Sequence, residues 1–282
     1  MGTVVSIRVV QGCAEAEPAI DRAFGWFHEI EACCTRFSPD SELMRLTSRT
    51  GEPVPTSAIL FEAVRFALMV AEETNGAFDP TIGHLVAERG YNREYRTGNI
   101  LPALPPDADV SYRCIELDPA RRTILLRRAL TLDLGAVAKG LAVDTAAREL
   151  APFENFSIDA GGDLYMAGLN AQGAPWSVGI RHPRRDGELI ETLRVSNQAV
   201  CTSGDYERPH HIVDPRAGNS ARTVASATVV APGAMLADAL ATAAFVLGPQ
   251  AGIDLLDRMG VEGLIVTPEL ERYETRSLCR AA

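Results

Sequence analysis

The chain has 282 residues, of which 46% are hydrophobic and 23% are charged, as is typical of globular proteins. Its formal net charge is −10, and no block of Lys and Arg offsets the excess of 37 acidic over 27 basic residues, so nucleic acid is not the expected partner. It contains no run of about 18 apolar residues, so we expect no membrane span.

The start of the chain and its cysteines indicate a compartment. The opening "MGTVVSIRVV" alternates like a strand and lacks the features of a secretory signal, so we expect a cytoplasmic protein. The cysteines lack CxxC spacing, which favours free thiols over a zinc site or a disulfide framework. They are Cys13, Cys33, Cys34, Cys114, Cys201 and Cys279.

Helical periodicity follows this first strand. Apolar residues at helical spacing predict a helix over 17–35. Ser38, followed by proline, is expected to cap a short helix that runs to Leu46. A long helix is expected over 57–75, with Thr56 as its cap.

The second half of the chain is rich in strands. The Pro-rich stretch "LPALPPDAD", 101–109, precedes it and marks a possible subdomain boundary within a single domain over 1–282. Strands are expected at 111–118, 122–128 and 130–134, and helices over 138–150, 234–247 and 249–259. Further strands are expected in "NFSIDAGGDLYMAGL", "WSVGIRHP", "ETLRVSN", "HHIVDP", "ASATVVAP" and "EGLIVTPE". Helices and strands do not alternate regularly, which predicts an α+β fold with mixed or antiparallel sheets and packed helices.

Short segments rich in small residues carry the side chains suited to chemistry. "GAFDPTIGHL" holds Asp79 at a helix end, and "LDLGAVAKG" runs from a strand into a helix with Asp133 and Lys139. The first N–H groups of that helix are suited to phosphate oxygens. "SIDAGGDLYMAG" places a glycine pair between two aspartates, which is typical of either a hairpin turn or a close approach by a ligand.

One later helix carries an unusual polar pair. "LADALATAA" places Asp238 and Thr242 on one helix face, about 6 Å apart along the axis. One interpretation is a capping or solvent-facing pair. The other is a Mg²⁺ site, because Mg²⁺ prefers a few protein oxygens and completes its octahedron with water and substrate phosphates, whereas zinc prefers nitrogen and sulfur.

Eight short motifs follow one another along the chain in a characteristic order. They are "MGT", "RFSPDSELMRL", "GAFDPTIG", "LDLGAVAKGLAVD", "DAGGDLYMAG", "TSGDY", "HHIVDPRAG" and "ADALATAAFVLG". Together they resemble the ApbE-type FAD:protein FMN transferase family, from residue 1 to about residue 270. The resemblance implies an ApbE-like fold with its active site in a cleft between two subdomains. It also implies a Mg²⁺-dependent enzyme that cleaves the pyrophosphate of FAD, transfers FMN to a Thr or Ser hydroxyl of an acceptor protein and releases AMP.

The resemblance also implies a role for particular residues. The backbone carbonyl of Ala136 and the side chains of Asp238 and Thr242 would bind the metal. The flavin end of FAD would lie near Met1, Phe37, Ala77, Phe78 and Asp79.

Three further positions match residues that contact FAD in the family. Lys139 would balance the diphosphate charge, while Asp133 and His211 are the candidate catalytic residues. With a pKa near ~6.5, His211 could take the proton of the acceptor hydroxyl. The reaction is a phosphoryl-type transfer, in which positioning and charge neutralisation carry most of the catalysis.

The sequence departs from the family in two places. Phe37 stands where a tyrosine is often found, and only "DYERPH", 205–210, separates Gly204 from His211, where many relatives have a longer hairpin. That loop is where an acceptor protein or the adenine end of FAD would dock. The shortened loop favours one alternative, an FAD pyrophosphatase that gives FMN and AMP. A second alternative, of another class, is a non-catalytic FAD-binding protein.

Overall fold

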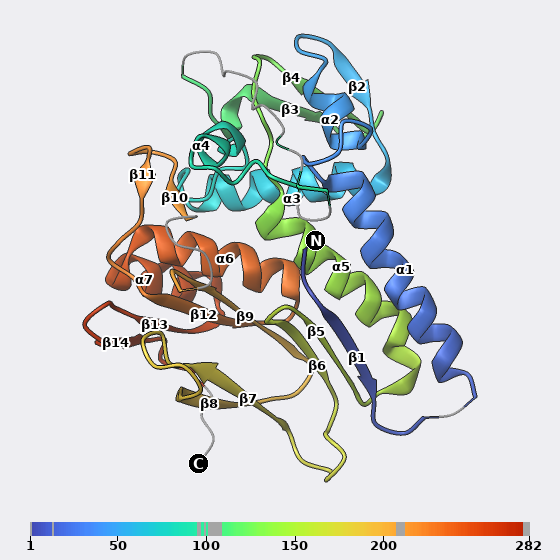
Figure 1. Cartoon of the computed structure of the whole chain (residues 1–282), viewed down its shortest axis with the longest axis vertical. Coiled ribbons are helices and arrows are strands. Elements are labelled where there is room, and N and C mark those ends of the chain that lie inside the picture. Colours follow the sequence, from blue (N-terminus) through green and yellow to red (C-terminus); the bar gives the residue numbers. More distant parts are fainter. Residues whose placement is uncertain are drawn as a thin grey trace.

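A seven-stranded sheet forms the centre of the molecule, and helices cover one of its faces (Figure 1). The computed structural model describes residues 2–12, 14–94, 97–98, 100, 109–206 and 212–278. The strands follow the order β1-β5-β6-β9-β12-β13-β14, and neighbouring strands are antiparallel. Their bounds are β1 (Val5–Val9), β5 (Phe156–Ala160), β6 (Asp163–Ala167), β9 (Gln198–Gly204), β12 (Ser226–Ala231), β13 (Glu262–Val266) and β14 (Arg272–Glu274).

Alternate residues of the central strands face two different layers. On β9, Ala199 and Cys201 belong to the core beneath the helices, whereas Val200 belongs to a second core beneath a β-hairpin on the other face. This period of two follows from strand geometry, which points successive side chains to opposite faces. Because both faces are covered, all 6 residues of β12 are buried, in agreement with its uncharged sequence.

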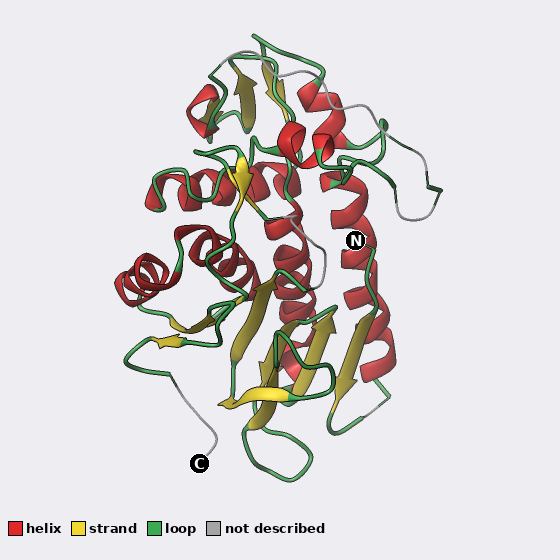
Figure 2. Cartoon of the chain, turned by 60° about the vertical axis from the view of Figure 1, so that its left-hand side comes forward, coloured by secondary structure: helices red, strands yellow, loops and turns green. Residues whose placement is uncertain are grey.

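Helix α1 packs against α5, and α5 packs against α6. Figure 2 shows helices gathered behind the strands of the large sheet. The helices are α1 (Ala16–Cys34), α2 (Glu42–Thr47), α3 (Ala58–Glu73), α4 (Gly83–Glu88), α5 (Gly135–Leu150), α6 (Ala234–Leu247) and α7 (Pro249–Met259). The predicted helices over 17–35, 234–247 and 249–259 therefore correspond to α1, α6 and α7. The α+β prediction is confirmed.

Two helix caps differ from those that the sequence predicts. Ser38 lies in a turn, where its carbonyl accepts a hydrogen bond from the N–H of Ser41 at 3.1 Å. The Oγ of Ser41 then caps α2 by accepting a backbone N–H three residues on, at 3.0 Å. For α3 the cap is Ser57 rather than Thr56, with the equivalent bond at 3.2 Å. In each case the next serine along the chain has the extended backbone that an N-cap requires.

Within the described residues, three smaller sheets accompany the large one. One sheet has the order β2-β4-β3 and lies at the upper end of the molecule in Figure 1. Its strands are β2 (Pro53–Pro55), β3 (Ile115–Asp118) and β4 (Thr123–Leu126). The hairpin over the large sheet pairs β7 (Trp176–Arg181) with β8 (Leu189–Val195), and β10 (Val213–Asp214) pairs with β11 (Asn219–Ser220). Residues Tyr112–Cys114 and Ala151–Phe153 form 3₁₀ turns.

The strand predicted over 130–134 is wrong. Its leucines at 130, 132 and 134 alternate with polar residues in the sequence, which explains the prediction, but Thr131 is buried together with them. In the fold, Thr131 instead forms an isolated parallel bridge with Ile82, and its carbonyl accepts the N–H of Gly83 at 3.1 Å. The segment leads directly into α5, which begins at Gly135 and not at residue 138.

Three further expectations from the sequence can be compared with the described residues. Cys33, Cys34, Cys114 and Cys201 are free thiols, while the other two cysteines lie outside the described residues. Within the described ranges, none of the helices combines the length and apolar character needed to cross a membrane. Most of the proposed subdomain boundary at 101–109 falls outside the described residues, so that boundary stays a prediction.

Candidate active site

Helices α5 and α6 approach each other closely at Gly140. A Cβ atom at this position would lie 2.5 Å from the backbone N and Cα of Met235 and 2.6 Å from the carbonyl carbon of Ala234. Only glycine fits such a backbone contact. The contact brings the preceding residue of α5, Lys139, to Asp238 on the following turn of α6.

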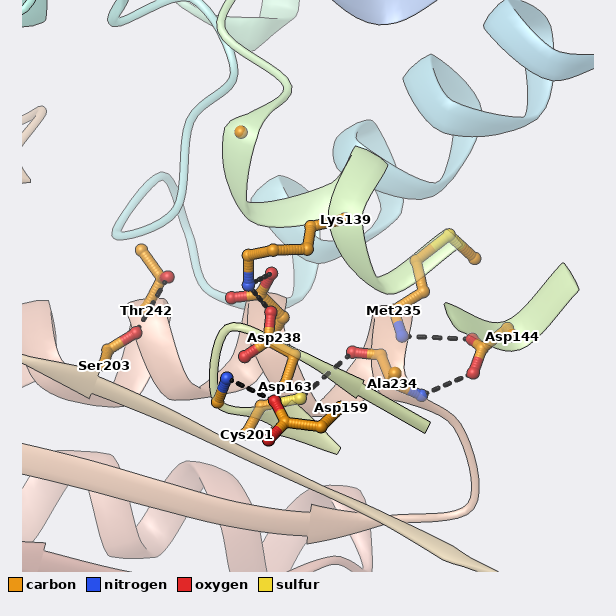
Figure 3. Close-up of polar contacts among 12 residues, drawn as sticks. Lys139, Asp144, Asp159, Asp163, Cys201, Ser203, Ala234, Met235, Asp238 and Thr242 are labelled. Atoms are coloured by element: carbon orange, nitrogen blue, oxygen red, sulfur yellow. Dashed lines mark hydrogen bonds and ion pairs between the residues drawn. The ribbon is translucent and has the colours of Figure 1, made fainter. Parts of the chain in front are cut away.

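Lys139 lies between two buried carboxylates (Figure 3). Its Nζ is 3.3 Å from Oδ2 of Asp238 and forms an ion pair with Asp163, which begins β6 after the glycine turn. Asp163 is 3% exposed and Asp238 is 8% exposed, so both carboxylates are largely removed from water. Two carboxylates thus share one ammonium group.

A pair of hydroxyls lies one turn further along α6. The Oγ1 of Thr242 is 3.2 Å from Oγ of Ser203 near the end of β9 (Figure 3). Thr242 and Asp238 occupy the same helix face because they are four residues apart. Along α5, Lys139 and Gly140 face α6 between Ala234 and Asp238. By this register, we expect the preceding turn of α5, which contains Ala136, to approach the turn that bears Thr242.

The groups on this face of α6 that could bind a metal ion are oxygen atoms: the buried carboxylate of Asp238 and the hydroxyl of Thr242, which contacts the hydroxyl of Ser203. Lys139, the partner of Asp238, lies in the first turns of α5, so the backbone carbonyls at the start of that helix are close to Lys139 in the sequence. Within the described part of the chain, no group of three or more His, Cys, Asp or Glu side chains is arranged to hold a metal ion. Among the described residues, these oxygen atoms fit Mg²⁺, which takes few protein oxygens, better than zinc, which prefers nitrogen and sulfur ligands.

Asp133 joins the start of α5 to the end of α1. Its Oδ1 accepts the N–H of Gly135 at 2.8 Å, and its Oδ2 accepts the Nε–H of Arg36 at 2.7 Å. The guanidinium carbon of Arg36 is 4.2 Å from the ring centroid of Phe37, within the range of a cation–π contact. This pairing therefore places Phe37 and Asp133 at the same end of α5.

The segment Ala77, Phe78 and Asp79 is buried beside Asp133. The carbonyl of Pro80 accepts the N–H of Asp133 at 2.8 Å, which fixes the two segments side by side. Burial raises the pKa of the Asp79 carboxyl above its ordinary value, although hydrogen bonds to it oppose the shift. These bonds come from the N–H and hydroxyl of Thr81, at 2.9 and 2.7 Å, and from the N–H of Tyr112 at 3.0 Å. The Asp79 side chain thus organises the loop that follows α3.

The N-terminal segment lies against the glycine turn between β5 and β6. A Cβ on Gly161, whose φ is +66°, would lie 1.8 Å from Oγ1 of Thr3. The same turn leads into Asp163, the partner of Lys139. Met1, predicted to lie near the flavin, is outside the described residues.

The candidate base His211 is also outside the described residues, as are 207–210 of the short loop. Three residues after His211 in the sequence, the carboxylate of Asp214 accepts a hydrogen bond from Arg216, with an Nε to Oδ1 distance of 3.0 Å. Burial raises the pKa of Asp214, but the hydrogen bonds from Arg216 outweigh burial and lower it overall. In this arrangement the Asp214 carboxylate is engaged by Arg216.

A cavity of about 330 Å³ adjoins the Asp79 loop. It lies between the loop and first turn of α4 on one side and the β10–β11 turn on the other. Its lining residues are Thr81, Ile82, His84, Leu85, Asp109, Val110, Pro215 and Gly218. A bond of 2.7 Å from Arg89 to the carbonyl of Gly218 ties the two walls together.

Contacts between distant segments therefore gather the sequence motifs around the N-terminal half of α5. Three residues at this site were missing from the predicted set: Arg36, Asp163 and Ser203. Arg36 precedes Phe37 in "RFSP", but its partner Asp133 is far away in the sequence. Asp163 follows the glycine pair, a pattern that a plain hairpin turn explains equally well. Ser203 lies in "TSG", next to Gly204.

Comparisons with known proteins agree with these motifs. The ApbE family profile matches residues 1–265. A protein of Treponema pallidum named FAD:protein FMN transferase is 32% identical over 311 residues, covering 95% of this chain and 83% of its own length. A protein of Vibrio cholerae with the same name is 30% identical over 286 residues, covering 94% of this chain and 85% of its own length.

Solved structures show the same fold. The ApbE protein of Thermotoga maritima superposes with a TM-score of 0.83 at 28% identity, covering 98% of this chain and 93% of its own. The flavin transferase ApbE of Vibrio cholerae gives a TM-score of 0.85 at 28% identity, covering 98% and 95%. The predicted family and fold are both confirmed. The chain belongs to the ApbE family of flavin-transferring enzymes.

Proposed function

We propose that this chain is a Mg²⁺-dependent FAD:protein FMN transferase whose acceptor is a Thr or Ser hydroxyl. The observation that carries the proposal is the meeting of α5 and α6, which places Lys139, Asp238 and Thr242 together. The names of the relatives support FAD as the substrate and a protein as the acceptor. The net charge of −10 also makes local positive charge necessary for binding a diphosphate.

The proposed reaction breaks the phosphoanhydride of FAD and forms a phosphoester with the acceptor hydroxyl. The acceptor hydroxyl attacks the phosphorus of the FMN half of FAD and loses its proton. The bond from that phosphorus to the bridging oxygen breaks, and AMP leaves with the bridging oxygen. The ammonium of Lys139 and the positive end of the α5 dipole would stabilise the charge that accumulates on the diphosphate.

The proposed metal ligands are the Asp238 carboxylate, the Thr242 hydroxyl and the carbonyl of Ala136. When bound, Mg²⁺ would neutralise diphosphate charge. Asp133 would orient the entrance of α5, because its carboxylate already binds Gly135 and Arg36. Phe37 would then offer an aromatic face to the flavin.

The proposed proton acceptor is His211. Replacing it by alanine should lower the turnover number by about 100-fold or more while changing FAD affinity far less, as expected for a general base. AMP release under saturating FAD gives the turnover, and a fluorescence titration with FAD gives the affinity. A large loss of FAD affinity with unchanged turnover would refute this role.

The overall proposal is tested with FAD, MgCl₂ and a candidate acceptor protein. We expect stoichiometric AMP and an acceptor heavier by the mass of FMN, and EDTA should stop both. Replacing the modified Thr or Ser by alanine should remove the added mass. Free FMN and AMP without any acceptor would instead identify a pyrophosphatase. Bound FAD that never yields AMP would identify a binding protein.

A further inference from the structure

A carboxylate outside the proposed ligand set caps α6, the helix that carries two of the proposed ligands, Asp238 and Thr242. Asp144, on α5, accepts the N–H of Ala234 at 2.6 Å with Oδ1 and the N–H of Met235 at 3.0 Å with Oδ2 (Figure 3). These are the first two residues of α6. Burial raises the pKa of the Asp144 carboxyl, and the two N–H donors partly offset this shift.

The cap is supplied by another helix because α6 has no cap of its own. Its N-cap residue is Gly233, which has no side chain to accept a hydrogen bond. A Cβ on Gly233 would lie 3.0 Å from Oδ2 of Asp144, so a larger residue would crowd the carboxylate. An N-cap normally stabilises its own helix, whereas this one also fixes α6 relative to α5.

The same turn of α6 is bound from the sheet. The Sγ of Cys201 on β9 lies 3.7 Å from the carbonyl of Ala234. Cys201 and Ser203 are two residues apart on β9 and therefore share a face, and Ser203 is the partner of Thr242. The backbone of Ala234 is thus bound at its N–H by Asp144 of α5 and at its carbonyl by Cys201 of β9.

These contacts restrain rotation of α6 about its own axis relative to α5 and β9. Asp238 and Thr242 follow Ala234 at intervals of four residues, so all three lie along one helix face. A rotation of the first turn would be passed to both side chains because an α-helix is stiff over this length. Two bonds to successive N–H groups resist rotation better than a single bond.

We propose that Asp144 is a positioning residue that sets the orientation of Asp238 and Thr242 toward α5, a role that rests on the proposed Mg²⁺ site. Asp144 does not itself touch FAD or the ion in this proposal. It acts through the first turn of α6.

The test compares Asp144→Ala and Asp144→Asn with Ser57→Ala. Ser57→Ala removes the cap of a different helix, α3, through one bond of 3.2 Å, and serves as the matched control. The readouts are the MgCl₂ concentration that gives half-maximal AMP release at saturating FAD, and the rise in Tm produced by MgCl₂ alone. Both are measured at a temperature where each variant is folded by circular dichroism.

We expect Asp144→Ala to raise the half-maximal MgCl₂ concentration by about 10–100-fold, the range typical of residues that orient metal ligands. Asp144→Asn keeps the shape and one acceptor oxygen, so its shift should be smaller, and it remains measurable if the alanine variant does not fold. Ser57→Ala should lower Tm by a few degrees but leave the MgCl₂ requirement within about twofold.

The outcomes separate this inference from the proposed function. If the wild type needs MgCl₂ and both folded Asp144 variants need the same amount, Asp144 is only a structural cap and the inference is overturned. If the wild type turns over FAD without MgCl₂, the proposed function is wrong, and the inference falls with it.

Discussion

Replacing Asp238 by alanine should remove most Mg²⁺-dependent turnover, with a loss of about 100-fold or more in AMP release at saturating FAD. Asp238 supplies the buried carboxylate of the proposed ligand set, and its removal leaves Lys139 paired with Asp163 alone. Asp238→Asn should have nearly the same effect, because an amide keeps the shape but not the charge. Turnover as a function of MgCl₂ is the measurement.

A matched control separates this effect from a general change in charge. Asp254 lies exposed on α7, where it accepts a bond of 3.0 Å from Gln250. Asp254→Asn removes the same charge, and we expect wild-type turnover and an unchanged MgCl₂ requirement. Normal MgCl₂-dependent turnover in Asp238→Ala would show that this carboxylate is not a ligand.

Gly140→Ala should destabilise the protein by about 2 kcal/mol or more, although alanine is the better helix former. Helix propensity alone favours alanine over glycine by about 1 kcal/mol. Here the added methyl would meet the backbone of Met235 at 2.5 Å, and a backbone cannot rotate away as a flexible side chain can. Helices α5 and α6 would have to separate, so turnover should fall together with stability.

The control for this prediction is Gly25→Ala in α1. A Cβ on Gly25 has no neighbour within 4 Å, so propensity alone applies and the variant should be more stable by about 0.5–1 kcal/mol. Urea unfolding of both variants gives the comparison. Equal stabilisation by the two substitutions would mean that the contact at Gly140 does not limit the distance between the helices.

Much of the fold follows from local patterns in the sequence. The helices at 17–35 and 249–259 were predicted because their apolar residues recur at helical spacing, and the helix at 234–247 because its sequence is rich in alanine. The strand expected at 130–134 failed because its leucines alternate with polar residues in the sequence as in a strand, whereas in the fold Thr131 forms an isolated bridge with Ile82. Local patterns do not identify distant partners.

The residues of the site also divide into those that a local pattern identifies and those that depend on a distant partner. Asp238 and Thr242 were identified because both lie on one helix, where spacing alone determines their shared face. Asp163 and Ser203 were missed because they reach the site through pairing of strands that are distant in sequence. Arg36 was missed for a related reason, since its partner Asp133 comes from another part of the fold.

The contact between Thr3 and Gly161 has a practical consequence for experiments on this protein. Whatever is fused ahead of Thr3 must leave the molecule beside the glycine turn that leads into Asp163. An affinity tag or fluorescent label there would crowd the place where FAD is proposed to react. The far edge of the large sheet, at β14, is the better attachment point.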